Sequence, residues 1–442
     1  MRRLTRGEYL SACLTAAAVA PGFLARPYLS AHNYRRYQER RIRRLLFHAY
    51  DCTAFYRRLY DRAGVSPADF RALEDLRHFP TTTKEQLVAA IEAGELGPRR
   101  DGIESVSSGS SGRVIRVTHH VPDIHAYAAG RFRILNINGR LRPWDRTVYI
   151  YTSEFPARSF FGLYPSSFIP TLNDLDDTIR RLQSLRPRVL CVYPSRLIEI
   201  AARLDRGAAR ALGIALISVN SETSSREQRA TLADHFGCPV LDEYSTEELG
   251  WTAAECAHGQ LHVWEDMARL EILRLDTDEA PEHGEAGEIV GTNLHNFATP
   301  FIRYRQGDLG ELNDVACPCG RNFRVLRNLV GRCNDAFHFE SESVSPAYLL
   351  DAVYSLLLEE RFPIADFCLI QTAGDAVRFE YTPRGVSAPE LDVAIADSLA
   401  TLLPSGIHVE AVPRTALFKT ATGKRNPIVS LVRGSSREPA HV

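Results

Sequence analysis

The feature that most restricts the fold is a set of four short apolar runs separated by segments of helix length. Continuous apolar strands that alternate with helices are typical of a parallel sheet buried on both faces. The 442 residues are more than one core accommodates, so two or three structural units are expected. The sequence therefore predicts an α/β protein with a mainly parallel sheet, whose strands lie at 148–151, 189–193, 215–219 and 239–241.

The segments around this sheet have other patterns. Residues 259–313 alternate in the manner of antiparallel strands, and from residue 331 a compact αβ unit follows. We expect a large N-terminal domain, 1–330, that includes an antiparallel β subdomain, and a small C-terminal α+β domain, 331–442. Helices are predicted at 30–62, 123–138, 347–359 and 389–402, and C-terminal strands near 366–370, 376–381 and 407–411.

Composition excludes several classes of partner. A net charge of −1 gives no electrostatic basis for binding nucleic acid or an anionic membrane. No apolar run reaches the roughly 18 residues of a membrane span. Residues 9–20 slightly resemble a signal peptide, but Glu8 and Pro21 interrupt the pattern and no cleavage site is clear, so secretion is not expected. Nine cysteines without a framework pattern indicate a reducing compartment, and hence a cytoplasmic protein.

One loop is rich in glycine and serine. Glycine allows successive backbone N–H groups to point into one concavity, and such nests hold phosphate. It is not a Walker loop, because that motif needs a lysine directly after the last glycine and a helix beyond it, whereas residues 114–117 read as a strand. A flexible linker is the alternative, which this stretch alone leaves open. The residues are Ser107, Ser108, Gly109, Ser110, Ser111, Gly112 and Arg113.

Three further stretches follow this loop in order. They are DEYSTEELG at 242–250, FIRYRQGDLG at 301–310 with Gly331 and Arg332 beyond it, and KTATGKR at 419–425. Each alone also fits an acidic strand end, a polar turn or a basic surface loop. In this order and spacing, the four stretches resemble those of the adenylate-forming enzymes that include acyl-CoA synthetases and luciferases.

Within that superfamily the chain resembles the phenylacetate–CoA ligase branch. The stretches that carry this likeness are FYRR at 55–58, GVSP at 64–67, PTTTK at 80–84, YPS at 193–195, Ser221 with Glu222, and GTNL and PFIRY at 291–294 and 300–304. The resemblance runs from about residue 50 to residue 432. It implies the adenylate-forming fold, with a small mobile C-terminal lid that swings about a hinge at 332–335. It also implies activation of a carboxylic acid by ATP, with release of pyrophosphate, and transfer of the acyl group to a thiol such as CoA.

The resemblance also implies roles for single residues. The glycine- and serine-rich loop would hold the β- and γ-phosphates, and Thr246 would contact phosphate beside it. Glu247 would help to hold Mg²⁺, a hard cation that carboxylate oxygens suit. The other nucleotide-site residues that it implies are Ser221, Glu222, Tyr244, Ser245, Asp308 for the two ribose hydroxyls, and Arg332 for the ribose and phosphate region.

A C-terminal lysine completes the implied catalytic set. Lys424 would bridge the carboxylate and the α-phosphate during adenylation, and Lys419 is the nearby competitor. A flexible point charge suits a group that must enter and leave the site.

The chain departs from the family pattern in two informative places. The aromatic residue that stacks on adenine usually lies four residues before the glutamate, where this chain has Glu243. Either Tyr244 still stacks or adenine is held differently. Residues 339–346 read FESESVSP, where the family has a glycine-containing loop along the pantetheine channel. The two added carboxylates put CoA, an anion, in doubt as the acceptor.

A separate group of cysteine and histidine residues has the composition of a tetrahedral zinc site. The expected ligands are Cys256, His262, Cys317 and Cys319, with His258 as a substitute for one of them. Unrelated buried cysteines are the alternative. Because both pieces flank the nucleotide-binding strands, the predicted zinc is structural and would fix the loop that carries Asp308.

The substrate is expected to be an aryl or similarly small organic acid. Aromatic residues within 150–170, together with 219–223, would line its pocket or simply belong to the core. Two rival functions remain: an adenylate-forming ligase whose acceptor is an amine or a carrier-protein thiol, and a catalytically inactive nucleotide-binding protein. The sequence also allows a homodimer.

Overall fold

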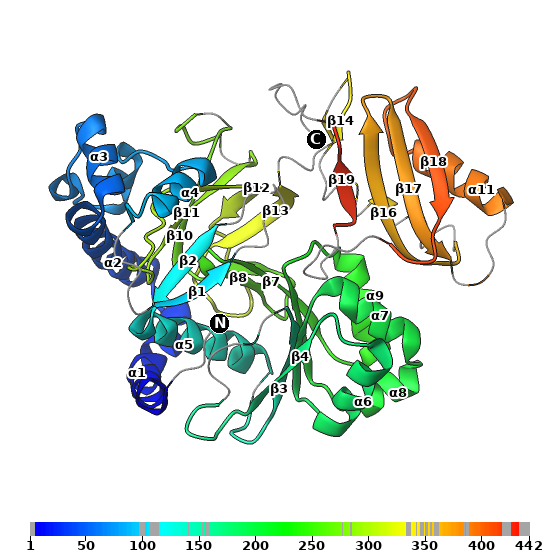
Figure 1. Cartoon of the computed structure of the whole chain (residues 1–442), viewed down its shortest axis with the longest axis horizontal. Coiled ribbons are helices and arrows are strands. Elements are labelled where there is room, and N and C mark those ends of the chain that lie inside the picture. Colours follow the sequence, from blue (N-terminus) through cyan, green and yellow to red (C-terminus); the bar gives the residue numbers. More distant parts are fainter. Residues whose placement is uncertain are drawn as a thin grey trace.

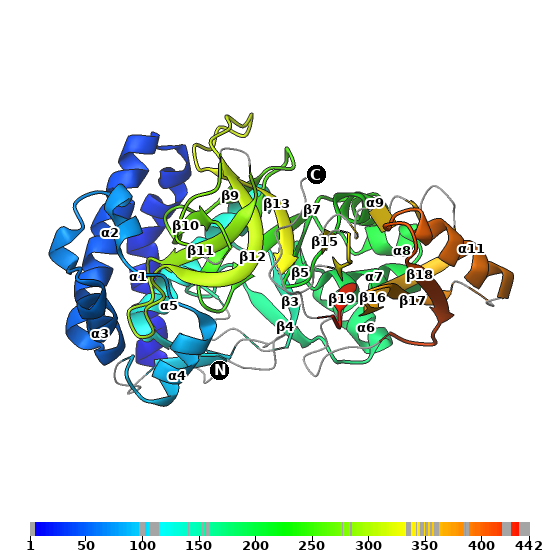
Figure 2. The same cartoon turned by 90° about the horizontal axis from the view of Figure 1, so that it is seen from above.

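The computed structural model describes the chain apart from residues 1–4, 97–101, 107–114, 140, 153, 155–158, 276, 283–284, 333–336, 342, 345–348, 350–351, 354–355, 358–361, 384, 386–388, 418–425 and 433–442. Helices cluster at one end of the molecule and a separate small sheet lies at the other, with a large sheet between them (Figures 1 and 2).

The large sheet has eleven strands in the order β10-β11-β12-β13-β9-β8-β7-β6-β5-β3-β4. Strands β4, β3, β5, β6 and β7 are parallel, which confirms the predicted parallel core. The antiparallel strands that were expected as a subdomain continue the same sheet beyond β7. The bounds are β3 Thr147–Tyr151, β4 Ser166–Pro170, β5 Val189–Val192, β6 Leu216–Asn220, β7 Val240–Thr246, β8 Gly250–Glu255, β9 Leu261–Val263, β10 Ala268–Leu273, β11 Gly287–Asn293, β12 Tyr304–Asn313 and β13 Val325–Arg332.

The two faces of the parallel strands differ in chemistry. One face is aliphatic and packs against four helices, α6 Leu175–Leu185, α7 Pro194–Arg203, α8 Arg206–Ala211 and α9 Arg226–Phe236. The opposite face carries aromatic and polar side chains and lies against α5, Val121–Gly139. Because side chains alternate along a strand, the sequence of each strand contains both sets. The aliphatic set is Val148, Ile150, Leu190, Val192, Ile217 and Val219, and the other includes Tyr149, Tyr151, Cys191 and Ser218.

The N-terminal helices follow the predicted pattern with one correction. The single helix expected at 30–62 is two helices, α2 Ala31–Cys52 and α3 Ala54–Ala63. Thr53 separates them because its backbone is extended and its hydroxyl accepts a hydrogen bond from the N–H of Tyr56, 3.2 Å away, which caps α3. Helix α4, Lys84–Glu92, and a hairpin of β1 Gly102–Val106 and β2 Arg116–His120 follow.

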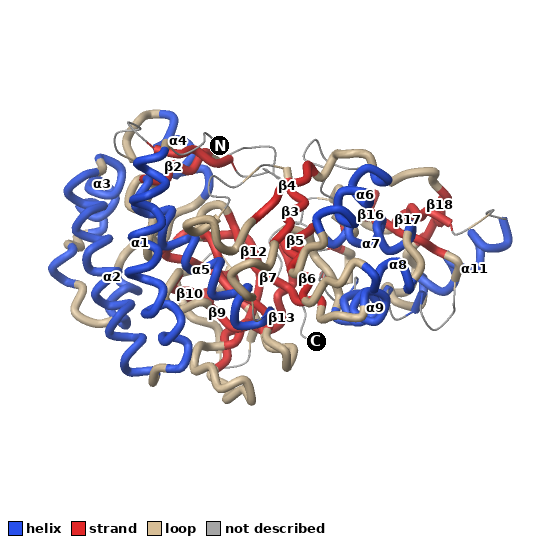
Figure 3. Tube along the Cα trace, turned by 90° about the horizontal axis from the view of Figure 1, so that it is seen from below, coloured by secondary structure: helices blue, strands red, loops and turns tan. Residues whose placement is uncertain are grey.

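Helix α1, Arg6–Ala25, corrects the expectation about apolar runs. With the short turn that follows it, the segment Arg6–Tyr28 is long and apolar enough to cross a membrane, and 17% of its apolar window is buried. Pro21 lies inside the helix rather than ending it. In Figure 3, α1 lies between α2 and α5, and it packs closely against α5.

The C-terminal end of α1 is tied into the protein interior. Phe23 is 2% exposed and packs with Trp264 and Phe323. Asp266 is completely buried and pairs with Arg133 at 2.7 Å and with Arg26, just after α1, at 3.4 Å. This anion therefore joins α1, α5 and the segment between β9 and β10.

The C-terminal unit has its own sheet, in the order β18-β17-β16-β19, and its own core around Phe367, Phe379 and Tyr381. Its strands and helix confirm the expected pattern, whereas the helix expected at 347–359 lies largely outside the described residues. Strand β13 runs through Arg332, so the expected boundary at 330/331 falls inside a strand of the large sheet. The bounds are β14 Phe337–His338, β15 Ser343–Val344, β16 Ile364–Ala373, β17 Ala376–Pro383, α11 Pro389–Ala400, β18 His408–Pro413 and β19 Ile428–Ser430.

The buried ion pair generates a test of this architecture. Asp266→Asn leaves the buried guanidinium of Arg133 without its counter-charge, so we expect the free energy of unfolding to fall by about 3–5 kcal/mol. Urea denaturation followed by circular dichroism measures it. The matched control is Asp176→Asn, which breaks an exposed pair with Arg203 and should cost far less, because solvent screens that pair. Equal losses in both variants would contradict the anchoring role of Asp266.

Candidate active site

Polar residues collect where the parallel strands end. The chain leaves β5 at Tyr193, β6 at Ser221 and β7 at the turn after Thr246. Parallel strands present their carboxyl ends at one edge, which is where open α/β sheets bind ligands. Burial raises the pKa of the Tyr193 hydroxyl, and the negative charges of Glu222 and Glu247 contribute to the rise. The side chains at the three strand ends therefore lie close enough for their charges to interact.

Two predicted nucleotide-site residues meet directly. The hydroxyl of Tyr244 on β7 donates a hydrogen bond to Oδ2 of Asp308 on β12, at 2.6 Å. Residue 308 lies opposite Arg332 in the antiparallel pairing of β12 and β13, so the backbone positions of the two predicted ribose contacts are neighbours. The side chain of Arg332 lies outside the described residues. A carboxylate held by one tyrosine retains further acceptor sites for ribose hydroxyls.

Glu243 does not take the place of a stacking aromatic residue. Its side chain points into the core, is 4% exposed, and pairs with Arg131 of α5. Ser218 on β6 donates a second hydrogen bond to it. A buried carboxylate needs such partners because an unpaired charge in the interior is costly. Tyr244, the next residue, points to the opposite face of β7, where its hydroxyl meets Asp308.

Ser221 and Glu222 shape the end of β6. Ser221 has a left-handed backbone, with φ of 67°, which is uncommon for a residue with a side chain. The carboxylate of Glu222 accepts hydrogen bonds from the backbone N–H and the hydroxyl of Ser195, each at 2.9 Å, in the first turn of α7. Glu222 thus links the end of β6 to the end of β5. Its negative charge is favourable there because it lies at the N-terminus of α7.

The turn after β7 carries the remaining predicted catalytic groups. Ser245 and Thr246 close the pairing of β7 with β8, and the Thr246 hydroxyl accepts a hydrogen bond from the N–H of Leu249 at 3.0 Å. Glu247 is exposed, whereas Glu248 is 8% exposed. In the family pattern the metal-binding glutamate lies four residues after the stacking aromatic residue. If Tyr244 is that aromatic residue, the position falls on Glu248, so both Glu247 and Glu248 are candidates for the metal-binding carboxylate.

Several predicted residues lie outside the described part of the chain. They are the loop Ser107, Ser108, Gly109, Ser110, Ser111, Gly112 and Arg113, and the two lysines Lys419 and Lys424. The flanking strands β1 and β2 pair with each other up to Val106 and Arg116. A strand therefore follows the loop, as predicted, rather than the helix of a Walker motif.

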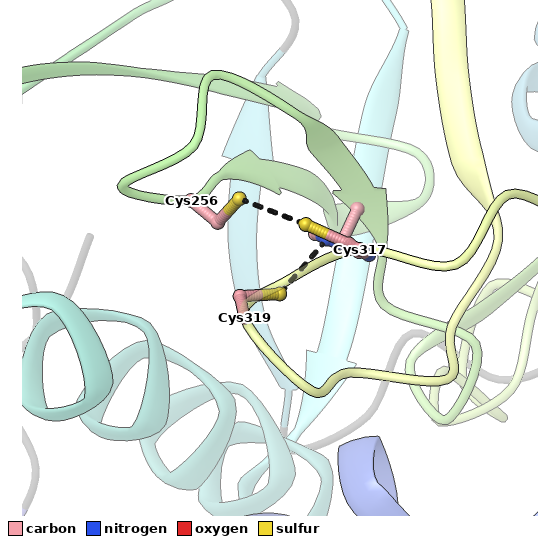
Figure 4. A group of neighbouring side chains, drawn as sticks. Cys256, Cys317 and Cys319 are labelled. Atoms are coloured by element: carbon pink, nitrogen blue, oxygen red, sulfur yellow. Dashed lines mark hydrogen bonds between the residues drawn. The ribbon is translucent and has the colours of Figure 1, made fainter.

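The four predicted metal ligands come together between the antiparallel strands (Figure 4). Their ligand atoms all lie within 4.8 Å of one another. Cys256 Sγ is 3.7 Å from Cys317 Sγ, and Cys319 Sγ is 3.2 Å from Nε2 of His262. Nδ1 of His262 lies 3.0 Å from the carbonyl oxygen of Phe323. His258 is not part of this group.

This donor set fits a tetrahedral metal site. A hydrogen bond from Nδ1 to a carbonyl leaves Nε2 as the ligand atom, an arrangement typical of metal-binding histidines. Three sulfur atoms and one nitrogen favour zinc, and four protein ligands leave no open position for catalysis.

Two residues of this region were missed from the sequence. Arg131 and Ser195 hold Glu243 and Glu222, respectively. A signal for Arg131 was present: a cation in a mostly apolar helix and a carboxylate in a buried strand each need a partner. Nothing in the sequence pairs Ser195 with Glu222.

The site can now be compared with known proteins. No family model matches the chain. A phenylacetate–coenzyme A ligase of Thermus thermophilus is 28% identical over 332 residues, which cover 72% of this chain and 74% of that protein. The corresponding enzyme of Escherichia coli is 28% identical over 331 residues, 72% of this chain and 75% of its own length. These matches confirm that the chain resembles the phenylacetate–CoA ligase branch of the adenylate-forming enzymes.

A solved structure supports the predicted fold. A 2-hydroxyisobutyryl-CoA ligase in its postadenylation state superposes with a TM-score of 0.78 at 20% identity, over 92% of this chain and 91% of that one. The same ligase in its thioesterification state gives a TM-score of 0.63. The postadenylation structure therefore superposes on this chain better than the thioesterification structure does.

The hydrogen bond between Tyr244 and Asp308 gives a specific expectation. Tyr244→Phe removes a bond to a charged group, worth roughly 1.5–3 kcal/mol, so we expect KM for ATP to rise about tenfold or more while kcat changes little. Steady-state pyrophosphate release measures both. Tyr50→Phe is the matched control, because Tyr50 donates to Asp61 at 2.9 Å on the exposed surface. A fall in kcat at unchanged KM would show that Tyr244 acts otherwise.

Proposed function

We propose that this protein is an ATP-dependent acid–thiol ligase. It activates a carboxylic acid to an acyl-adenylate, releases pyrophosphate, and transfers the acyl group to CoA. The observation that carries the proposal is the meeting of Tyr244 and Asp308 beside the strand ends that bear Glu222 and Glu247. A ribose carboxylate and an acidic turn at the edge of a parallel sheet are what a nucleotide–Mg²⁺ complex requires.

Each group has a proposed task. The Asp308 carboxylate accepts hydrogen bonds from the ribose hydroxyls, and Tyr244 orients that carboxylate. Carboxylates of the turn after β7, of which Glu247 is the preferred candidate, hold Mg²⁺. The cation screens the phosphate charge while the substrate carboxylate attacks the α-phosphate. The glycine- and serine-rich loop, with Arg113, supplies donors for the β- and γ-phosphates. Lys424 lies beside the attacking carboxylate in this proposal, because the reaction brings two anions together.

For the substrate and the acceptor we propose chemical classes rather than single compounds, and we also propose a compartment. Aromatic side chains on the α5 face of the parallel strands favour an aryl or similarly small acid. CoA agrees with the relatives, whose names specify coenzyme A. The exposed Glu340, in the acidic segment after β14, favours the second candidate, an amine or a carrier-protein thiol as acceptor. We propose that the enzyme works in the reducing cytoplasm, where its free thiols persist.

The C-terminal unit is proposed to move between the two half-reactions. A lysine needed for adenylation would obstruct the acceptor afterwards, so the lid must turn about the residues that follow β13. The two states of the 2-hydroxyisobutyryl-CoA ligase, which this chain matches unequally, support such an alternation.

Lys424→Ala tests this function and this motion together. We expect acid-dependent pyrophosphate release to be abolished, because adenylation loses its cation. Thioester formation from synthetic phenylacetyl-adenylate and CoA should persist, because the second half-reaction does not use this lysine. The matched control is Lys419→Ala. If Lys424→Ala releases pyrophosphate normally and Lys419→Ala does not, the catalytic lysine is Lys419; if wild type releases none with any aryl acid yet binds ATP, the inactive alternative holds.

We also propose that Cys256, His262, Cys317 and Cys319 hold one structural zinc ion. The metal would link the turn after β8 to the loop between β12 and β13, and so support the strand that carries Asp308. Metal analysis should find about one zinc per chain. Cys317→Ser with Cys319→Ser should lose the zinc and lower Tm, whereas the exposed Cys52→Ser should change neither. Purified protein that lacks zinc at full stability would contradict the proposal.

A further inference from the structure

Exposed apolar side chains concentrate on one element of the described chain. Of its 14 exposed large hydrophobic residues, four lie on α1 and the turn that follows it, and a fifth, Leu29, comes directly after that turn. Leu10 and Leu14 are 50% and 57% exposed. They share a helix face with Ala17, Ala18, Pro21 and Leu24, since these positions recur every three or four residues. From Leu10 to Leu24 this face carries no charge.

A hairpin tip extends the same surface. Phe160 and Leu163 exchange two backbone hydrogen bonds of 2.8 Å around Phe161 and Gly162. Phe161 is 47% exposed and Leu163 is 44% exposed, so the tip presents apolar side chains to solvent. The φ of 49° at Phe161 is a left-handed conformation that costs a bulky residue energy. Tyr9 of α1 contacts the adjoining Ser159 through its hydroxyl, 3.0 Å from Oγ, so tip and helix are neighbours.

Trp144 completes the surface. Its indole is 71% exposed, the largest exposed fraction among the large hydrophobic residues described. The carbonyl of the preceding Pro143 accepts a hydrogen bond from the N–H of Tyr164, which places Trp144 beside the hairpin tip. We call Leu10, Leu14, Trp144, Phe161 and Leu163 the apolar patch.

Cations border this patch. Arg6, four residues before Leu10 on α1, and Arg142, two residues before Trp144, are both exposed. An apolar helix face, an aromatic tip and an exposed indole, with two guanidinium groups beside them, match the chemistry of an anionic bilayer surface: acyl chains below and phosphate above.

The net charge of −1 predicts no overall attraction to an anionic membrane, so binding must rest on the local patch and the arginines beside it. We propose that the apolar patch docks this enzyme on an anionic lipid bilayer, with α1 lying in the plane of the interface. A spanning orientation does not fit, because Ala12, Cys13 and Phe23 of α1 are buried against the protein. The backbone of Pro27 also accepts a hydrogen bond from Asn322 at 2.7 Å. In Figure 1, α1 and strands β3 and β4 lie along the lower side, whereas the C-terminal sheet lies at the upper right. Docking therefore leaves the C-terminal unit on the far side from the lipid.

Vesicle binding by the full chain tests the proposal. The wild-type protein should co-float with vesicles of phosphatidylcholine and 30 mol% phosphatidylglycerol, bind vesicles of pure phosphatidylcholine less, and dissociate partly at high salt. Leu10→Ser with Leu14→Ser and Phe161→Ser should reduce binding by about tenfold or more. The matched control, Val393→Ser with Leu431→Ser, removes exposed apolar side chains of the C-terminal unit and should bind as wild type does.

Trp144 provides a direct reporter. Of the three tryptophans, Trp264 is completely buried, and Trp251 is partly buried on β8, where Arg131 of α5 lies over its ring. Quenching by brominated acyl chains should therefore come mainly from Trp144 and should be largely lost in Trp144→Phe. Unchanged pyrophosphate release by the patch variant would show that it is folded. Vesicle binding that is absent, or unaffected by the patch substitutions, overturns the proposal. So does a dimer that the patch substitutions dissociate and that does not bind vesicles, since a second copy would then be the occupant.

Discussion

Strand β7 is paired in opposite senses on its two sides, and the site depends on this arrangement. On one side it continues the parallel strands, whose carboxyl ends gather Ser221, Glu222 and Tyr193. On the other side it turns back at once into β8, so that the antiparallel half of the sheet begins there. The acidic turn between β7 and β8 is thereby held at the edge where the parallel strands stop. From there β9, β13 and β12 bring Asp308 within reach of Tyr244.

Much of this could be predicted from the sequence because local patterns carried it. The apolar runs of the parallel strands and the alternation of β10 and β11 require no knowledge of distant partners. Cysteine and histidine residues in two short groups were enough to predict a cluster that the fold then assembles. The nucleotide-site residues came from the order of short stretches, which a family resemblance made interpretable.

The rest depended on contacts between distant residues. In the sequence, Glu243 occupies the position of the aromatic residue that stacks on adenine. Its side chain instead faces α5, where it pairs with Arg131. The sequence of a strand alone does not reveal which face of the sheet a residue occupies. The break at Thr53 was hidden because both flanking helices are amphipathic. Helix α1 was judged by its interrupting residues, although Glu8 caps its first turn and Pro21 is tolerated within it. At Glu243 tertiary packing decided what the local pattern left open, whereas at Thr53 and Glu8 local caps set the helix ends.

The pairing of Glu243 with Arg131 has a consequence for descent. Either charge alone would be stranded in the interior, so a lineage can hardly lose one residue and keep the other. The two positions, 112 residues apart, should behave as a single inherited character: both charged in some relatives, both neutral in others, with mixed pairs rare. The apparent substitution beside Tyr244 is then half of a paired exchange. Its other half is Arg131, in a helix that lies outside the nucleotide-binding stretches.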